Sequence, residues 1–406
     1  MRASVAARLS AMMFLNYFVW GAWYTTIGTW MTATLKFSGT QTGAVFGTTA
    51  LASMISPFFI GLIADRFFAT ERLLAALHLI GAVILYFIAQ STSFASVYPL
   101  MLLYCICFFP TIPLTNSLTL RHITNAGNQF PLIRVFATLG WIGISLLIGF
   151  LAVEASPKQF LISAGFSLLM SAYSLTLPHT PPSARGQKAT WRKILGIDAM
   201  VMLRDRSYLV FLIASVLFCI PLTFYFSFTN AFLNEAGVRN AAGKMSLGQA
   251  SEVVMMLLMP VIFRNFRLKT ILCAGLLAWT LRYALLAAGD AGTGMWMFYA
   301  AILLHGICFD FFTVTGQIYT DQEAPPHLRS TAQGFLTFLT YGVGMFAGSM
   351  LSGIAVDFFT TPAGRNWRGF WLTSSLGSLV IFLLVAAAFR SRSVVSARSA
   401  AAAAEA

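Results

Sequence analysis

The sequence has few charged residues and few cysteines, and each shortage excludes a class of protein. Only 10% of its 406 residues are charged, whereas soluble domains carry about a quarter. A soluble globular enzyme is therefore excluded, and a hydrophobic content of 58% also excludes a disordered chain. The five cysteines lie inside apolar segments without disulfide or metal-ligand spacing. A polytopic helical membrane protein without a metal ion or other cofactor is the class that remains.

Twelve apolar segments are long enough to cross a bilayer, which takes about 20 helical residues. They cover residues 9–33, 41–64, 72–91, 96–120, 131–153, 158–178, 208–233, 244–263, 268–289, 294–320, 329–356 and 368–390. The polar interval 179–207, with two prolines and six basic residues, divides them six and six. We predict an all-α major facilitator fold: an N-terminal six-helix bundle at 1–178, a cytoplasmic linker at 179–207, a C-terminal bundle at 208–390 and a disordered cytoplasmic tail at 391–406.

The net charge of +13 comes from 26 Lys and Arg against 13 Asp and Glu. These basic residues lie between the apolar segments and form no patch, so nucleic-acid binding is not expected. With the N-terminus in the cytoplasm, 19 of them fall inside and 6 outside, and Arg282 lies within a segment. The positive-inside rule therefore places both termini in the cytoplasm.

The two halves of the sequence contain matching stretches. LLYCICF at 102–108 corresponds to LLHGICF at 303–309, an offset of 201 residues. Residues 56–74 and 259–272 share a layout in which a helix ends, a short basic turn follows and a helix restarts. Two homologous halves around a cavity at the bilayer midplane form a transporter architecture.

Glu252 and Asp310 are the two carboxylates expected near the middle of a membrane-spanning segment. An ionisable group at this depth costs at least about 2.5 kcal/mol and is a functional candidate. Burial generally raises the pKa of a carboxyl group, which suits one that must take up and release a proton. The alternative is a permanent ion pair with Arg134 or Arg282. His305 is poorly aligned with Asp310 on a helix, which favours a neutral core histidine over a proton relay.

A set of ordered motifs narrows the class of transporter. The turn at 61–66 reads Gly-Leu-Ile-Ala-Asp-Arg, which is similar to the G-x-x-x-D-R loop of the major facilitator superfamily. The others are FVWGAWYTTIGTW (18–30), PTIPLTNS (110–117), FPLIRVFATLGWIG (130–143), LPHTPP (177–182), GQASE (248–252), LAWTLRYALLAAGD (277–290) and FDFFTVTG (309–316). Together they resemble the bacterial nucleoside:proton symporters, the NupG and YegT type of permease in that superfamily.

The resemblance implies a monomeric, multi-pass protein of the bacterial inner membrane that imports nucleosides such as uridine or adenosine. Inward proton flow would drive the uptake, and the two bundles would rock to give alternating access. A nucleoside needs hydrogen-bonding groups for its ribose and base, and an aromatic face on which the base can stack. Helical spacing provides polar stripes of this kind, for example Arg134, Thr138 and Trp141, or Asp310, Thr313 and Gln317.

The residues predicted to bind substrate extend over several segments. They are Trp20, Asn116, Arg134, Thr138, Trp141, Thr223, Phe226, Gln249, Glu252, Phe309, Asp310 and Gln317. Glu252 and Asp310 are also predicted to carry the proton. Trp20 lies well inside its segment, which favours a cavity wall over an interfacial anchor. Asn116 either contacts substrate or bonds to a neighbouring helix.

The seventh segment departs from the pattern of the NupG branch, which has Gln and Asn where this chain has Thr223 and Phe226. Either the base is read elsewhere, for example by Asn230, or the substrate differs. Helix back-bonding of Thr223 and ordinary packing of Phe226 are the structural alternatives. Asp65 and Arg66 in the first cytoplasmic turn, and Arg121 near Asp321, are predicted gate contacts, unless they serve only to orient the chain.

Two other functions stay open at this point. The altered seventh segment fits a major facilitator carrier for another small polar substrate, such as a sugar or an organic ion. An intramembrane enzyme or a sensor is the alternative from a different class. The sequence shows no G-x-S-x-G, H-E-x-x-H, P-loop or dinucleotide motif, and its longest polar interval is too short for a sensory domain. We therefore expect no enzymatic activity.

Overall fold

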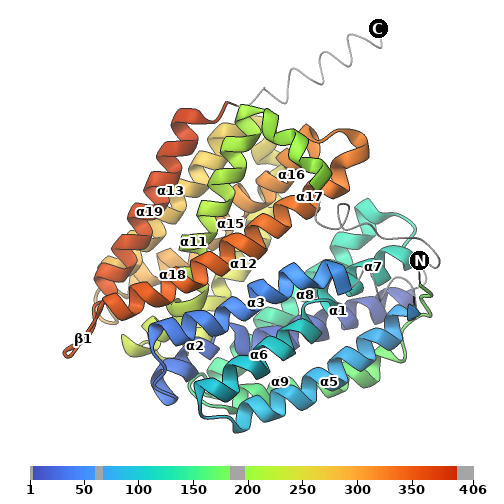
Figure 1. Ribbon diagram of the computed structural model, residues 1–406, viewed down its shortest axis with the longest axis horizontal. Coiled ribbons are helices and arrows are strands. Elements are labelled where there is room, and N and C mark those ends of the chain that lie inside the picture. The colour runs from blue at the N-terminus through green and yellow to red at the C-terminus, as the bar shows by residue number, and fades with distance from the viewer. Residues whose placement is uncertain (1–2, 60–66, 183–196, 391–406) are drawn as a thin grey trace. The chain divides into compact units, whose positions relative to one another are not determined.

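The computed structural model describes residues 3–59, 67–182 and 197–390, which are helical almost throughout (Figure 1). The first half contains α1 (Ala3–Tyr24), α2 (Ile27–Thr29), η1 (Trp30–Thr34), α3 (Gly39–Phe59), α5 (Thr70–Gln90), α6 (Phe94–Phe108), α7 (Thr111–His122), α8 (Ala126–Phe150) and α9 (Lys158–Ser174). The second half contains η3 (Ile197–Arg204), α11 (Arg206–Glu235), α12 (Ala241–Asn265), α13 (Leu268–Ala288), α14 (Met295–Leu303), α15 (His305–Phe309), η4 (Asp310–Val314), α16 (Thr315–Glu323), η5 (Pro326–Leu328), α17 (Arg329–Thr337), η6 (Phe338–Gly344), α18 (Met345–Phe358) and α19 (Trp367–Ala388). A small hairpin of β1 (Thr360–Thr361) and β2 (Gly364–Arg365) joins the last two helices.

The helices overlap the predicted apolar segments, and several long segments consist of consecutive helices. Segment 9–33 bends after Tyr24 into α2 and the π-helical turn η1, and segment 294–320 contains α14, α15, η4 and α16. Within the described part of the chain, nine helices are long and apolar enough to cross a membrane. α3 is not among them. The count of twelve spans stays a prediction.

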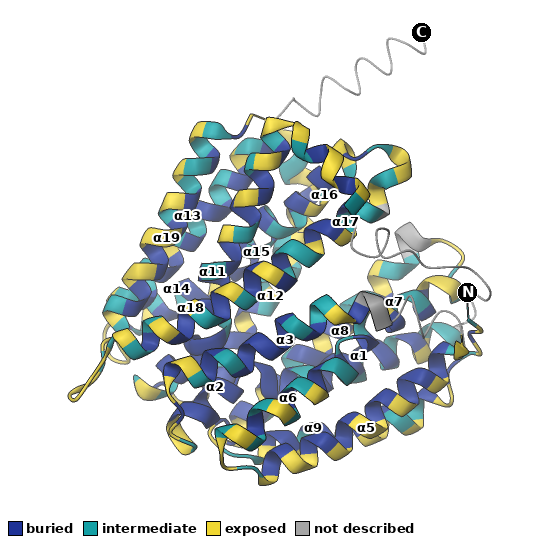
Figure 2. Cartoon of the chain, in the orientation of Figure 1, coloured by how far each residue is buried: buried dark blue, intermediate teal, exposed yellow. Residues whose placement is uncertain are grey.

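The exposed surface of the helices is apolar. On α5 the exposed side chains include Leu79, Ile80, Val83, Tyr86 and Phe87, and Figure 2 shows exposed positions recurring along α5 and α19. Apolar patches of this extent are rare on soluble monomers. They match the lipid-facing sides of membrane-spanning helices, whose backbone polar groups are satisfied inside each helix.

The chain divides into two compact units. The first contains residues 1–194, 223–246 and 341–358, and the second contains 195–222, 247–340 and 359–406. α5 packs along α9 in the first unit, and α13 packs along α19 in the second (Figure 1). α11 and α12 each contribute residues to both units. The first unit thus joins segments from both predicted bundles, and the bundle boundaries stay predictions.

Small residues bring α3 and α18 together within the first unit. Gly39, Gly43 and Gly47 recur every four residues on α3. A Cβ at Gly43 would lie 2.3 Å from the carbonyl oxygen of Ser349, and one at Gly353 would lie 2.4 Å from that of Gly39. The two backbones approach this closely because glycine has no side chain, as at other small-residue interfaces of membrane helices.

Asp357, near the end of α18, caps the beginning of α3. Its carboxylate accepts hydrogen bonds from the backbone N–H groups of Gly39 (2.6 Å) and Thr40 (2.7 Å), and from the Thr40 hydroxyl (2.6 Å). The first N–H groups of a helix have no partner inside that helix, and the helix dipole favours a negative charge beside them. A capping carboxylate supplied by α18 therefore ties α18 to α3.

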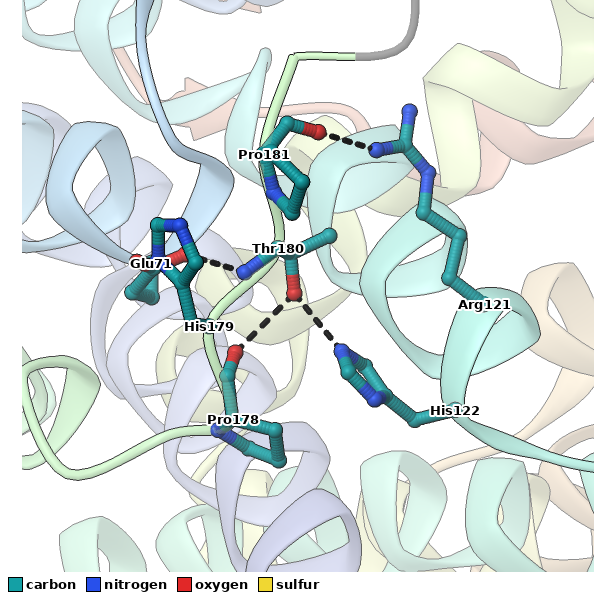
Figure 3. Close-up of polar contacts among 7 residues, drawn as sticks. All are labelled: Glu71, Arg121, His122, Pro178, His179, Thr180 and Pro181. Carbon is teal, nitrogen blue, oxygen red and sulfur yellow. Dashed lines mark hydrogen bonds and ion pairs between the residues drawn. The ribbon is translucent and has the colours of Figure 1, made fainter.

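The first residues of the predicted linker are fixed to the ends of α5 and α7 (Figure 3). The buried carboxylate of Glu71 accepts hydrogen bonds from His179 Nδ1 (2.7 Å) and from the Thr180 backbone N–H (3.0 Å). The Thr180 hydroxyl donates to the Pro178 carbonyl (3.0 Å), so its oxygen accepts from His122 Nε2 (2.8 Å). Arg121 Nη1 donates to the Pro181 carbonyl at 2.6 Å. We call these seven residues the linker clamp.

Candidate functional site

Three of the predicted substrate-binding residues meet in an aromatic cluster within the first unit. The cluster consists of Tyr17, Trp20, Tyr24, Trp141 and Phe226. Trp20 and Trp141 meet edge to face with ring centroids 5.1 Å apart. Tyr24 lies 5.8 Å from Trp141 and 5.9 Å from Phe226. α1, α8 and α11 therefore bring five aromatic rings into contact with one another.

Arg134 extends this cluster with a positive charge. Its Nη2 donates to the Tyr17 hydroxyl at 2.9 Å, and its guanidinium carbon lies 4.5 Å from the centre of the Tyr17 ring. Thr138 is half-buried one helical turn further along α8. Tyr17 and Tyr24 were not predicted from the sequence. Their spacing from Trp20 on α1 (three residues before, four after) places all three on one helix face and is the signal that identifies them.

Several polar atoms of the predicted residues are buried without a hydrogen-bond partner in the described part of the chain. They include Trp20 Nε1, Trp141 Nε1 and Asn116 Oδ1 in the first unit. Buried polar groups in proteins are nearly always paired, and an unpaired one costs about 1–3 kcal/mol. An incoming polar ligand can supply the missing partners. Trp23, by contrast, donates to the Tyr104 hydroxyl at 3.3 Å and lies in the core.

The remaining predicted residues lie in the second unit, apart from Thr223, which is buried on α11 in the first. Glu252 on α12 keeps 21% of its side chain exposed, and its Oε2 lies 3.6 Å from Nε2 of the buried His305. Phe309 stacks on His305 with centroids 5.9 Å apart. Gln249 is half-buried one turn before Glu252.

Asp310 is fully buried, and neither carboxyl oxygen has a hydrogen-bond partner among residues 3–59, 67–182 and 197–390. It begins the π-helical turn η4 (Asp310–Val314), where the sequence predicts a regular helix. Wider turns of this kind occur often at functional sites. The wider turn also changes the helix face on which the following residues lie. Thr313 and Gln317, predicted to lie on the same face as Asp310, are therefore no longer aligned with it. Gln317 is accordingly exposed, and its carbonyl accepts from Gln333.

A buried carboxylate missed by sequence reasoning lies between α8 and α9. Glu154 accepts hydrogen bonds from Asn230 Nδ2 (2.8 Å), Asn234 Nδ2 (2.7 Å) and the Ala242 backbone N–H (3.0 Å). Asn230 Oδ1 accepts in turn from the Thr29 hydroxyl. We call these five residues the Glu154 network. The amide of Asn230 is already engaged there, which argues against the hypothesis that it reads a base.

The predicted gate residues are placed only in part. Asp65 and Arg66 lie outside the described residues. Arg121 belongs to the linker clamp, and Asp321 lies 4.0 Å from Arg329 in an exposed pair. Within the ranges that the structure describes, no three His, Cys, Asp or Glu side chains gather closely enough to hold a metal ion.

Comparison with known proteins identifies the family. The family model described as nucleoside H+ symporter matches residues 3–393. The chain belongs to this family. It is 39% identical over 399 residues to the putative nucleoside transporter YegT of Escherichia coli K12, covering 95% of this chain and 93% of YegT. It is 34% identical over 397 residues to the xanthosine permease of the same organism, covering 94% of each.

A solved structure has the same fold. The crystal structure of the nucleoside transporter NupG matches with a TM-score of 0.88 at 29% identity, covering 96% of this chain and all of the NupG chain. These similarities confirm the resemblance seen in the motifs and the all-α fold of a major facilitator transporter. The chain is a multi-pass protein of the bacterial inner membrane, and its family is one of transporters rather than enzymes.

Proposed function

We propose that this chain imports nucleosides together with protons by alternating access. The family to which it belongs is described by this reaction, and its relatives include a putative nucleoside transporter and a xanthosine permease. The observation that carries the proposal is the unpaired, fully buried carboxyl group of Asp310. It provides a proton-binding group inside the membrane in a family of proton symporters.

Asp310 is suited to carry a proton because its surroundings do not support a permanent charge. An ionised carboxylate without partners inside a protein is strongly unfavourable. Asp310 is therefore expected to hold a proton while it is sealed from water and to release it when water reaches it. Glu252, which is partly exposed, supplies a second carboxylate in the same unit.

The aromatic cluster is the proposed nucleoside-binding surface. Stacking of a base on an aromatic side chain is worth about 1–3 kcal/mol. Trp20 and Trp141 supply the rings, and their unpaired Nε1 groups are donors for base or ribose oxygens. Arg134 and Thr138 add donors on the adjacent turns of α8. The unpaired Oδ1 atom of Asn116 is an acceptor for a hydrogen bond from a ribose hydroxyl group.

Alternating access requires contacts that hold one side closed and can be broken. The Glu154 network and the Asp357 cap lie on the predicted outer side, and both join segments from the two predicted bundles within the first unit. They support a state in which the outer side is closed. A ligand or proton that binds the open and closed states with different affinity shifts the balance between them.

Uptake of labelled uridine, adenosine and xanthosine by cells producing this protein tests the proposal. The host strain must lack its own nucleoside permeases, and an empty-vector strain is the control. We expect accumulation above the external concentration that collapses when a protonophore dissipates the gradient. Accumulation that persists unchanged would contradict symport. Uptake inhibited by sugars or organic ions but by no nucleoside would instead favour the alternative carrier function.

A further inference from the structure

In the second unit, a buried arginine contacts a buried histidine, and this histidine lies beside Glu252. Arg282 on α13 is fully buried, and its Nη1 lies 2.9 Å from Nδ1 of His305. The other ring nitrogen of His305, Nε2, lies 3.6 Å from Glu252 Oε2. Three helices, α13, α15 and α12, thus each contribute one member of a chain that runs from the protein interior to a partly exposed carboxylate.

The order of these contacts fixes the state of the imidazole. A guanidinium group has only hydrogen-bond donors, so Nδ1 of His305 must accept from Arg282. The proton of the neutral ring then resides on Nε2 and faces the Glu252 carboxylate. Arg282 is itself held in place, since its guanidinium carbon lies 4.9 Å from the ring centre of Trp279, and Trp279 Nε1 donates to the Cys308 carbonyl.

Two glycines allow α12 and α15 to pack closely, which places Glu252 beside His305. A Cβ at Gly248 on α12 would lie 3.1 Å from the Cβ of His305, and one at Gly306 on α15 would lie 2.4 Å from the Ser251 carbonyl oxygen. The Gly306 backbone N–H donates to the Ser251 hydroxyl at 3.0 Å. α12 and α15 therefore approach closely, which brings Glu252 beside His305 and leaves little freedom for the imidazole.

We propose that His305 and Arg282 are positioning residues that orient the Glu252 carboxylate for nucleoside binding. The inference rests on the proposed function and on the prediction from the sequence that Glu252 also binds the nucleoside. Arg282 sets the tautomer and angle of the imidazole, and the Nε2–H group of His305 faces Oε2 of Glu252 at 3.6 Å, where it attracts the carboxylate. The carboxylate remains partly exposed, so its other oxygen is available to a ribose hydroxyl. No proton passes through His305, because its Nδ1 is occupied by a donor.

Substitutions of His305 that differ in reach test this role. Glutamine carries its amide N–H about as far from the backbone as Nε2, whereas the shorter asparagine amide corresponds to Nδ1. We expect His305→Gln to retain the nucleoside Kd of the unaltered protein within about threefold, and His305→Asn and His305→Ala to raise it about tenfold, which corresponds to about 1.4 kcal/mol. The Kd is measured by calorimetry on purified protein with the nucleoside that binds most tightly. Equal Kd values for the three variants would overturn the proposal.

A double-mutant cycle separates positioning from general damage to the fold. If His305 acts through Glu252, then His305→Ala has little further effect on the Kd once Glu252→Gln is present. His78 provides the matched control, because it is a buried histidine in the first unit that contacts Asn16 and Ser167. His78→Ala is expected to add its effect fully to that of Glu252→Gln. Additive effects of His305→Ala would overturn the proposal.

Thermal unfolding of the variants and nucleoside binding by the unaltered protein are measured as well. Thermal unfolding of each variant shows whether it is folded. If His305→Ala fails to fold, the comparison of Kd values between His305→Gln and His305→Asn decides whether His305 positions Glu252. If the unaltered protein binds no nucleoside at all, the proposed function fails. If it binds nucleoside and the His305 effects are additive with those of Glu252, only the positioning role fails.

Discussion

Asn230 Nδ2 lies 2.8 Å from Glu154 Oε2, although the two residues are 76 positions apart in the chain. The buried carboxylate also collects hydrogen bonds from Asn234 and Ala242, and all three donors are neutral. The carboxylate thus organises the loop between α8 and α9 together with α11 and the start of α12. Removing it takes away the acceptor of the Ala242 backbone N–H group and one acceptor of each of the Asn230 and Asn234 amides.

The first prediction concerns this network. Glu154→Ala is expected to lower the thermal midpoint of the purified protein by several degrees, since each unpaired buried donor costs about 1–3 kcal/mol. Glu154→Gln keeps one acceptor oxygen and should give an intermediate loss. Lys158→Ala, an exposed change at the start of α9, is the control. A midpoint for Glu154→Ala equal to that of the control would contradict the role of the network.

The second prediction concerns the approach of α3 and α18. Gly43→Ala would place a methyl group 2.3 Å from the Ser349 carbonyl oxygen, so the helices must separate and the folded yield should fall. Gly165→Ala on α9 is the matched control, because a Cβ there meets nothing within 4 Å. Alanine is favoured over glycine in a helix by about 1 kcal/mol, so the control should be neutral or stabilising. Size-exclusion profiles and thermal midpoints in detergent report both outcomes.

The third prediction concerns base stacking. Trp141→Ala is expected to raise the KM for nucleoside uptake about tenfold or more, because loss of one stacking ring costs about 1–3 kcal/mol. Trp141→Phe retains a ring but loses the Nε1 donor, so its KM should lie between those values. Trp296→Phe, at an exposed site on α14, should leave the KM unchanged. An unaltered KM for Trp141→Ala would remove this residue from the binding surface.

The fourth prediction ranks the members of the linker clamp. Glu71→Ala removes the acceptor of both His179 and the Thr180 backbone, and should destabilise the protein by about 1–3 kcal/mol. His179→Ala should cost less than about 1 kcal/mol, because the imidazole is mostly exposed and exposed pairs contribute little. Chemical or thermal unfolding of the two variants checks the order. The reverse order would show that the imidazole, not the backbone contact, holds the linker.

Local sequence patterns were sufficient for the class of protein, while the roles of the candidate residues stay predictions. Long apolar runs predict membrane helices because hydrocarbon excludes unpaired backbone groups, and the described helices overlap those runs. The free-energy cost of an ionisable group within such runs made Glu252 and Asp310 functional candidates. The ordered motifs supplied the substrate class, which composition and periodicity do not contain.

Features that depend on distant parts of the chain were not predicted. Glu154 lies in a loop, and its partners are supplied by α11 and α12, so no spacing rule connects them. The π-helical turn at Asp310 breaks the regular 3.6-residue period on which the predicted stripe to Gln317 depended. His305 was expected to be a neutral core histidine, and its contacts with Arg282 and Glu252 emerge only when three helices are packed together.

Asp310→Asn in proteoliposomes tests the central claim most directly. The claim is that proton binding at Asp310 couples the proton gradient to nucleoside import. With an inside-alkaline gradient, the unaltered protein should accumulate nucleoside, whereas Asp310→Asn should not, because its amide cannot take up and release a proton. Exchange of labelled for unlabelled nucleoside without a gradient should persist in the variant. Gradient-driven accumulation by Asp310→Asn at the rate of the unaltered protein would contradict the account.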